Sequence, residues 1–146
     1  MIPRRLMLAM TFAAVATRVS AQSEGGIPAK LYKTPDCGCC DGYARYLRRN
    51  GFAVESVASH DLPLIKKQYR VPEKLEGCHT TVVGEYVIEG HVPIEPVKKL
   101  LAERPSIRGI SLPGMPEGSP GMTGRKTEPF VIYVIDDSGN EVYARV

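Results

Sequence analysis

Three of the four cysteines in the chain lie within four consecutive residues, Cys37-Gly38-Cys39-Cys40. Cys37 and Cys40 have the C-x-x-C spacing that serves thiol–disulfide exchange or metal binding, and Cys39 lies between them. We expect a helix to begin at this segment, where free backbone N–H groups and the helix dipole favour anionic sulfur and lower thiol pKa values. Packing alone does not explain such a cluster. Plain structural disulfides are the alternative to metal or redox chemistry.

The fourth cysteine precedes a β-branched run, in Cys78-His79-Thr80. Cys78 is predicted to be a metal ligand or a redox partner, with a buried core thiol as the alternative. His79 is a second candidate ligand, although a histidine at the start of a strand can instead bond a backbone carbonyl. For His91 we favour that backbone-bonding role, and His60 is assigned no role.

Met115 and Met122 occur in similar Pro-Gly-Met settings within a glycine- and proline-rich stretch. A polar stretch of this kind is a poor place to bury methionine for packing. A thioether is a soft ligand that favours Cu(I) and needs no deprotonation. Both methionines are therefore predicted to be ligands or near-ligands, and the alternative is that they fold down as a hydrophobic plug.

Four thiols, two thioethers and imidazole nitrogen form a soft set of ligands. Zinc also accepts thiolate and histidine, but its sites usually combine two separated ligand pairs in a tetrahedron. Three cysteines crowded into one loop suit sulfur atoms that bridge several Cu(I) ions. Copper is therefore the expected metal, held as Cu(I) with Cu(II) as a second oxidation state, and zinc is the less favoured alternative.

The elements that must position these residues follow from hydrophobic periodicity and from glycine and proline placement. In chain order they are a strand Ala29–Lys33, a helix Cys40–Asn50, a strand Phe52–Val57, a helix Leu62–Tyr69, strands Thr80–Val83 and Tyr86–Glu89 around a Gly84-Glu85 turn, a helix from Pro93 or Ile94 to just before Pro105, a loop Gly109–Gly124, and strands Phe130–Ile135 and Glu141–Val146. The first seven elements match a thioredoxin-like plan. We predict an α/β fold with a mixed central sheet flanked by helices and a C-terminal hairpin.

The first 21 residues are predicted to be a cleaved export signal. Arg4 and Arg5 precede the apolar run Leu6–Ala16, and Val19-Ser20-Ala21 fits the small-residue rule for signal peptidase. The apolar run is too short to span a bilayer. Residues 22–146 then form one domain outside the cytoplasm, reached by the Sec route or by the twin-arginine route that the arginine pair suggests.

The charge of the chain argues against several classes of partner. The predicted leader holds three of the 19 basic residues and none of the 16 acidic ones, so 16 of each sign remain after cleavage. A net charge near zero argues against a broad nucleic-acid or anionic-membrane surface. We therefore expect no nucleic-acid partner and no membrane insertion of the mature chain.

With these residues in place, the sequence resembles the DUF411 family, whose members include copper-resistance proteins of the CopG type. The resemblance spans about Lys30 to Arg145. It is carried by four segments: Tyr32-Lys33-Thr34-Pro35-Asp36-Cys37-Gly38-Cys39-Cys40, Cys78-His79-Thr80, Glu89-Gly90-His91-Val92-Pro93, and Pro113-Gly114-Met115-Pro116 through Gly118-Ser119-Pro120-Gly121-Met122. One departure is Tyr43, where we would expect a tryptophan early in the first helix.

The resemblance implies an exported, thioredoxin-like, copper-binding protein with Cys37, Cys39, Cys40 and Cys78 as its metal ligands. The leading hypothesis is a periplasmic protein that holds copper for copper tolerance, with other periplasmic copper-handling proteins as partners. The alternative is an enzyme, a thiol–disulfide oxidoreductase that uses Cys37 and Cys40, with Cys39 or Cys78 resolving. A third hypothesis is a binding module with structural disulfides only.

Overall fold

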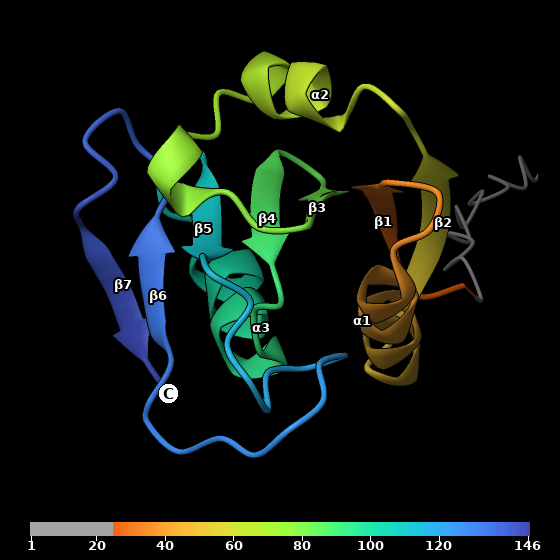
Figure 1. The fold of residues 1–146 in the computed structure, drawn as a ribbon. Helices are drawn as coiled ribbons and strands as arrows, with labels where there is room; N and C mark the ends of the chain where they lie inside the picture. Colours follow the sequence, from red (N-terminus) through yellow and green to blue (C-terminus); the bar gives the residue numbers. More distant parts are fainter. Residues whose placement is uncertain (1–24) are drawn as a thin grey trace, which may run out of the picture.

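The computed structural model describes residues 25–146, so the predicted export signal lies outside the described residues. Its elements are β1 (Ile27–Lys33), α1 (Gly38–Arg49), β2 (Phe52–Ala58), α2 (Leu62–Gln68), the short 3-10 helix η1 (Glu73–Leu75), β3 (His79–Val83), β4 (Tyr86–Gly90), α3 (Ile94–Glu103), β5 (Gly109–Leu112), β6 (Val131–Val134) and β7 (Val142–Arg145) (Figure 1). None of the helices within residues 25–146 is both long enough and apolar enough to cross a membrane.

All seven strands form one mixed sheet in the order β2-β1-β3-β4-β5-β6-β7. The β1/β2 and β4/β5 pairs are parallel, and the other neighbouring strands are antiparallel. The last two strands therefore extend the main sheet instead of packing aside. The prediction of an α/β fold with a mixed central sheet and flanking helices is confirmed.

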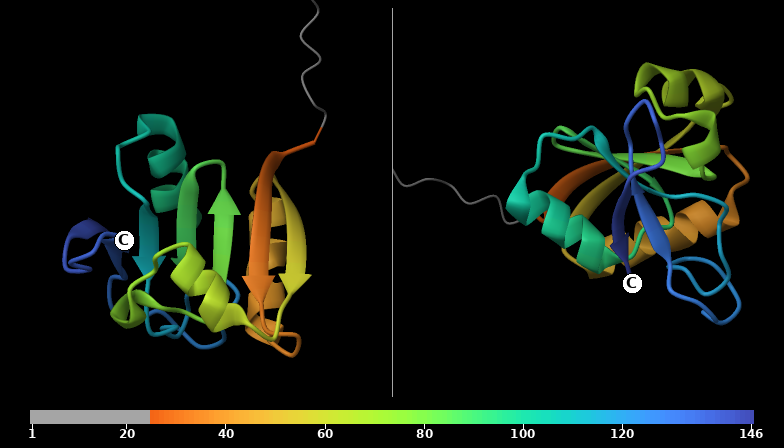
Figure 2. Two further views of the ribbon diagram at one scale, coloured as in Figure 1. Left: turned by 90° about the horizontal axis from the view of Figure 1, so that it is seen from above. Right: turned by 90° about the vertical axis from the view of Figure 1, so that its left-hand side faces the viewer.

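The helices cover both faces of this sheet. Helices α1 and α3 lie on one face, and α2 with η1 lies on the other (Figure 2). Helix α1 buries Tyr43, Ala44 and Leu47, whose i, i+1, i+4 spacing gives the helix one apolar face. It ends before Gly51, whose φ of 93° reverses the chain into β2.

The prediction of an uninterrupted loop over residues 109–124 is wrong at its beginning. Residues Gly109–Leu112 form β5, which pairs in parallel with β4 and is buried along its whole length. A Cβ atom on Gly109 would collide with the carbonyl oxygen of Val87, so glycine permits close strand pairing here. A four-residue strand that begins with glycine and is followed by proline gives too short a pattern to reveal a central strand.

Candidate metal centre

The candidate site lies where several strands end at the same edge of the sheet. Strand β1 ends at Lys33 and leads into the cysteine loop before α1, while β3 begins with His79 directly opposite Lys33. Strand β4 ends at Gly90, one residue before His91. The fold thus brings together side chains that are up to 54 residues apart, from Cys37 to His91.

All four cysteine sulfurs lie within 4.8 Å of one another. Cys37 and Cys40 form a disulfide, and Cys39 and Cys78 are free thiols. The Sγ of Cys78 lies 3.6 Å from that of Cys39 and 3.5 Å from that of Cys40, and Cys39 lies 3.5 Å from Cys37. The two cysteine segments that the sequence singled out therefore meet at a single sulfur cluster.

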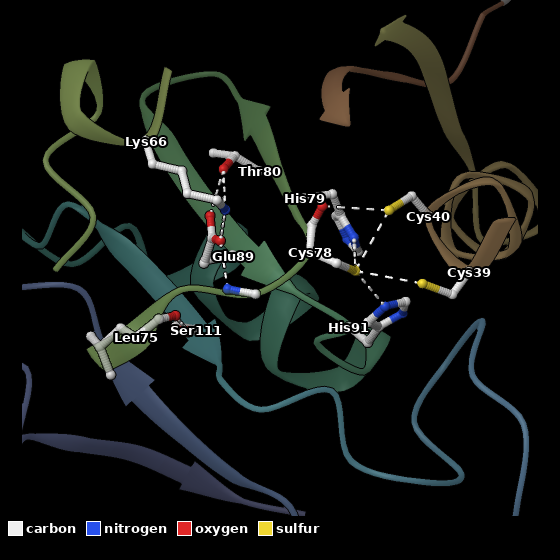
Figure 3. A network of polar contacts seen from close by, with 11 residues as sticks. Cys39, Cys40, Lys66, Leu75, Cys78, His79, Thr80, Glu89, His91 and Ser111 are labelled. Atoms are coloured by element: carbon white, nitrogen blue, oxygen red, sulfur yellow. Dashed lines mark hydrogen bonds and ion pairs between the residues drawn. The ribbon is translucent and has the colours of Figure 1, made fainter. Parts of the chain in front are cut away.

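Two histidines extend this cluster on the side of Cys78. The Cys78 Sγ lies 3.3 Å from Nδ1 of His79 and 3.1 Å from Nε2 of His91 (Figure 3). Nδ1 of His91 lies 2.7 Å from the carbonyl oxygen of Pro120, so Nδ1 carries the proton and Nε2 presents its lone pair toward Cys78. Both imidazoles are buried, and Nε2 of His79 has no hydrogen-bond partner among the described residues.

His91 is a candidate ligand that the sequence analysis did not select. The expected backbone hydrogen bond exists, but it engages only one ring nitrogen. A usable signal was present in the predicted hairpin. Its two-residue turn sets the register Val83↔Tyr86, which continues through Thr80↔Glu89 and, two residues beyond, places Cys78 opposite His91.

Burial sets the protonation of the site. It raises the pKa of Cys78 to about 12, with the contact to Cys39 adding to the effect. Burial also lowers the pKa of both histidines, His79 well below the ordinary range, where the neighbouring His91 ring adds to the effect. The metal-free site therefore holds a neutral Cys78 thiol and neutral imidazoles at neutral pH, and binding of a metal at Cys78 must release a proton.

Tyr43 occupies the place beside the histidines where the family resemblance suggested tryptophan. Its ring centroid lies 4.7 Å from that of His79 and 5.5 Å from that of His91. Its hydroxyl donates a 2.8 Å hydrogen bond to the carbonyl oxygen of Val92. Tyr43 thus packs against both imidazoles while its polar end is satisfied away from the sulfur atoms.

Behind the ligands lies a buried polar network centred on Glu89 (Figure 3). Its Oε2 accepts a 2.6 Å hydrogen bond from the Thr80 hydroxyl, and its Oε1 accepts a 2.8 Å bond from the backbone N–H of Gly77. Lys66 of α2 forms an ion pair with Glu89 and donates a 3.1 Å bond to Thr80. Since Gly77 directly precedes Cys78, this network tethers the backbone that carries the central sulfur.

The backbone around Cys78 is also held by close packing. A Cβ atom on Gly77 would lie 2.7 Å from the Cα atom of Gly90, and one on Gly90 would lie 2.5 Å from the carbonyl oxygen of Leu112. Glycine at both positions lets the chain before Cys78 approach the end of β4, where His91 follows. Cys78 and His91 are therefore kept adjacent by backbone contact as well as by side-chain hydrogen bonds.

The loop after β5, which carries Met115 and Met122, reaches this site through its second half. The carbonyl oxygen of Pro120 accepts the hydrogen bond from Nδ1 of His91. The next residue, Gly121, has φ of 86° and packs against the backbone of Cys39 and Tyr43. Met122 follows this contact and is half-buried. Met115 has φ of 45° and is 42 % exposed, so it lies at the surface of the loop.

Gly121→Ala is expected to displace the loop from α1 and to destabilise the protein by more than about 1 kcal/mol. A Cβ atom there would lie 2.5 Å from the backbone nitrogen of Tyr43, in a conformation that alanine already disfavours. Urea unfolding of the metal-free protein measures the loss. Gly114→Ala is the matched control, because Gly114 also has positive φ (80°) but faces open space. An equal loss in both variants would show that the contact with α1 contributes nothing.

The comparisons with known proteins agree with this fold and site. The sequence profile of DUF411, described as a protein of unknown function, matches residues 75–122. Two solved structures, forms 1 and 2 of "Copper resistance protein copG", each match with a TM-score of 0.75 and 33% identity, covering 83% of this chain and 98% of theirs. Among curated proteins, nothing matches.

The family profile matches 48 residues, which include Cys78 but not the cysteine loop, whereas the match to the solved structures covers 83% of the chain. The fold and site define an α/β protein with partly buried thiols and buried imidazole groups at one edge of its sheet. The chain belongs to the DUF411 family, as a relative of the CopG-type copper resistance proteins.

Proposed function

We propose that this protein binds copper, as Cu(I), in the cluster formed by Cys37, Cys39, Cys40 and Cys78, and that it serves copper tolerance. The observation that carries the proposal is the convergence of four sulfurs from two distant segments to within 4.8 Å of one another. Thiolate sulfur is the ligand that Cu(I) prefers. The two solved relatives are copper resistance proteins, which supports the same metal.

In this proposal, several Cu(I) ions share the sulfur atoms as bridging ligands. Counting the disulfide, each of the four cysteines has two other sulfurs within 3.6 Å. His79 supplies a nitrogen ligand beside Cys78, and the thioethers of Met122 and Met115 complete the set from the loop. The thiolates favour Cu(I), and the imidazoles also suit Cu(II), so the proposal includes both oxidation states of copper.

The cellular setting follows from the sequence. In this proposal, the protein is exported to the periplasm and residues 1–21 are removed. There it exchanges copper with other periplasmic copper-handling proteins. A thioredoxin-like arrangement of β1, α1, β2, β3, β4 and α3 is part of the proposal. It is supported by the position of the cysteine loop between a central strand and the first helix.

A second candidate function is thiol–disulfide exchange, and one observation favours it. The Cys37–Cys40 disulfide has the free thiol of Cys39 3.5 Å from Cys37 and that of Cys78 3.5 Å from Cys40. Either thiol is placed to attack the disulfide once it is deprotonated. Copper binding by all four sulfurs requires this disulfide to be reduced first, so the two functions belong to different oxidation states of one site.

The proposal is tested by copper stoichiometry. The reduced protein is loaded anaerobically with Cu(I), desalted, and assayed for copper per protein by elemental analysis, with zinc run in parallel. Two or more retained copper ions and little zinc are expected. Failure to retain copper, together with rapid pairwise oxidation of the thiols, would favour the oxidoreductase.

A further inference from the structure

The disulfide form of the site retains a second set of ligands. When Cys37 and Cys40 are bonded to each other, their sulfurs are lost as thiolates, but Cys78, His79 and His91 remain within 4.8 Å of one another. We propose that this form binds one divalent cation of borderline softness, of the Zn²⁺ class, through Cys78, His79 and His91. The inference deepens the proposed function, because it assigns a different metal to each oxidation state of the same site.

The spacing of the ligand atoms fits a single small ion. Ligand atoms held about 2.0–2.3 Å from a tetrahedral ion lie roughly 3.3–3.8 Å from one another. Cys78 Sγ lies 3.3 Å from His79 Nδ1 and 3.1 Å from His91 Nε2, so small side-chain rotations are sufficient. The Sγ of Cys39 lies 3.6 Å from that of Cys78 and can take the fourth coordination position of the ion. Where Cys39 does not bind, a water molecule takes this position.

The imidazoles are already oriented for this role. The carbonyl oxygen of Pro120 holds Nδ1–H of His91 and so fixes the tautomer that leaves Nε2 free, as a second-layer hydrogen bond does at many metal sites. His79 is fully buried, and its ring has a nitrogen without a hydrogen-bond partner among residues 25–146. Nδ1 of the same ring faces the Cys78 sulfur at 3.3 Å and is the nitrogen that would bind the cation.

The chemistry of the two sets explains the change of metal. Four thiolates form a soft, strongly anionic set, whereas one or two thiolates with two imidazoles form the borderline set that Zn²⁺ accepts. The change of state is a two-electron step. A dithiol reductant forms its own disulfide as the Cys37–Cys40 bond breaks, and Cys37 and Cys40 each take up a proton as thiols. The oxidation state of one cysteine pair thus selects the cation that the site holds.

The test uses the protein with its Cys37–Cys40 disulfide confirmed by peptide mass mapping. Zn²⁺ binding is measured by calorimetry, and Co²⁺ is used as a spectroscopic substitute whose absorption reports sulfur and nitrogen ligands. We expect one ion per protein, with His91→Gln weakening Zn²⁺ binding by at least roughly 100-fold because one of few ligands is lost. His60→Gln is the matched control, because this exposed histidine lies outside the site.

A Cys37→Ser/Cys40→Ser variant separates this inference from the proposed function. It removes the same two thiolates as the disulfide does, so it should keep one Zn²⁺ and lose the multiple Cu(I) ions. No bound Zn²⁺ in the disulfide form, or equal Zn²⁺ affinity in His91→Gln and the parent, would overturn the inference whatever Cu(I) does. If His91→Gln fails to fold, as circular dichroism would show, His79→Gln provides the same comparison. Retained Zn²⁺ with no Cu(I) in the reduced parent would instead overturn the proposed function alone.

Discussion

Cys78→Ser is expected to lower Cu(I) affinity by at least roughly 100-fold, since structural metal sites gain about 10–16 kcal/mol from some four ligands. Within residues 25–146, Cys78 belongs both to the four-cysteine group and to the group that it forms with His79 and His91. Its sulfur lies within 3.6 Å of two other sulfurs and two imidazole nitrogens. Serine keeps the size but removes the soft anionic ligand at the centre of the site. Competition of the reduced protein against a colorimetric Cu(I) chelator measures the change.

Cys39→Ser is the matched comparison for this prediction. Cys39 contacts the sulfurs of Cys37 and Cys78 but neither histidine, so its loss removes one thiolate and leaves the rest of the site intact. We expect a smaller loss of Cu(I) affinity and unchanged Zn²⁺ stoichiometry in the disulfide form. Equal losses of Cu(I) affinity in the two variants would contradict the central position of Cys78.

The meeting of the cysteine loop with Cys78 was predictable because it depends on local signals and on one strand pairing. The loop follows an apolar strand and precedes a helix, and the hairpin from Thr80 has a clear turn at Gly84. Placing β3 beside β1 then brings Cys78 to the loop. His91 required one further step, the hairpin register, because its local Gly-His-Val-Pro setting indicates only the approach to a helix.

The polar network behind the ligands could not be predicted in the same way. Helix α2 has the sequence LPLIKKQ, in which Lys66 and Lys67 have identical local propensity, yet Lys66 is buried and Lys67 exposed. Glu89 lies in an otherwise apolar strand, where its sequence suggests a solvent-exposed position. The pair forms only when α2 packs across the sheet, a tertiary contact between residues 23 positions apart. Burial of both charges follows from the fold and not from either segment.

Lys66→Met is expected to destabilise the metal-free protein by about 3–5 kcal/mol, because it leaves the Glu89 carboxylate buried without its cation. The fall in Tm should be roughly 10–20 °C for a domain of this size. Lys67→Met, an exposed substitution one residue along the same helix, is the control and should change the unfolding free energy by less than about 0.5 kcal/mol. Urea unfolding followed by circular dichroism measures all three proteins.

The loss in Lys66→Met should also depend on pH in one direction. Burial already raises the pKa of Glu89, against the opposing effect of Lys66, and removing Lys66 raises that pKa further. A carboxyl group whose folded pKa is raised contributes most below its unfolded pKa of about 4.3 and destabilises the fold as pH rises through the folded value. The deficit relative to the parent should therefore be small near pH 4 and full near pH 8.

Adding Glu89→Gln to Lys66→Met should restore much of the stability at pH 8, because the amide oxygen still accepts the Gly77 N–H and its NH₂ donates to Thr80. A deficit that does not change with pH, or a double variant as unstable as the single one, would show that lost packing at Lys66, and not the unpaired charge, causes the effect.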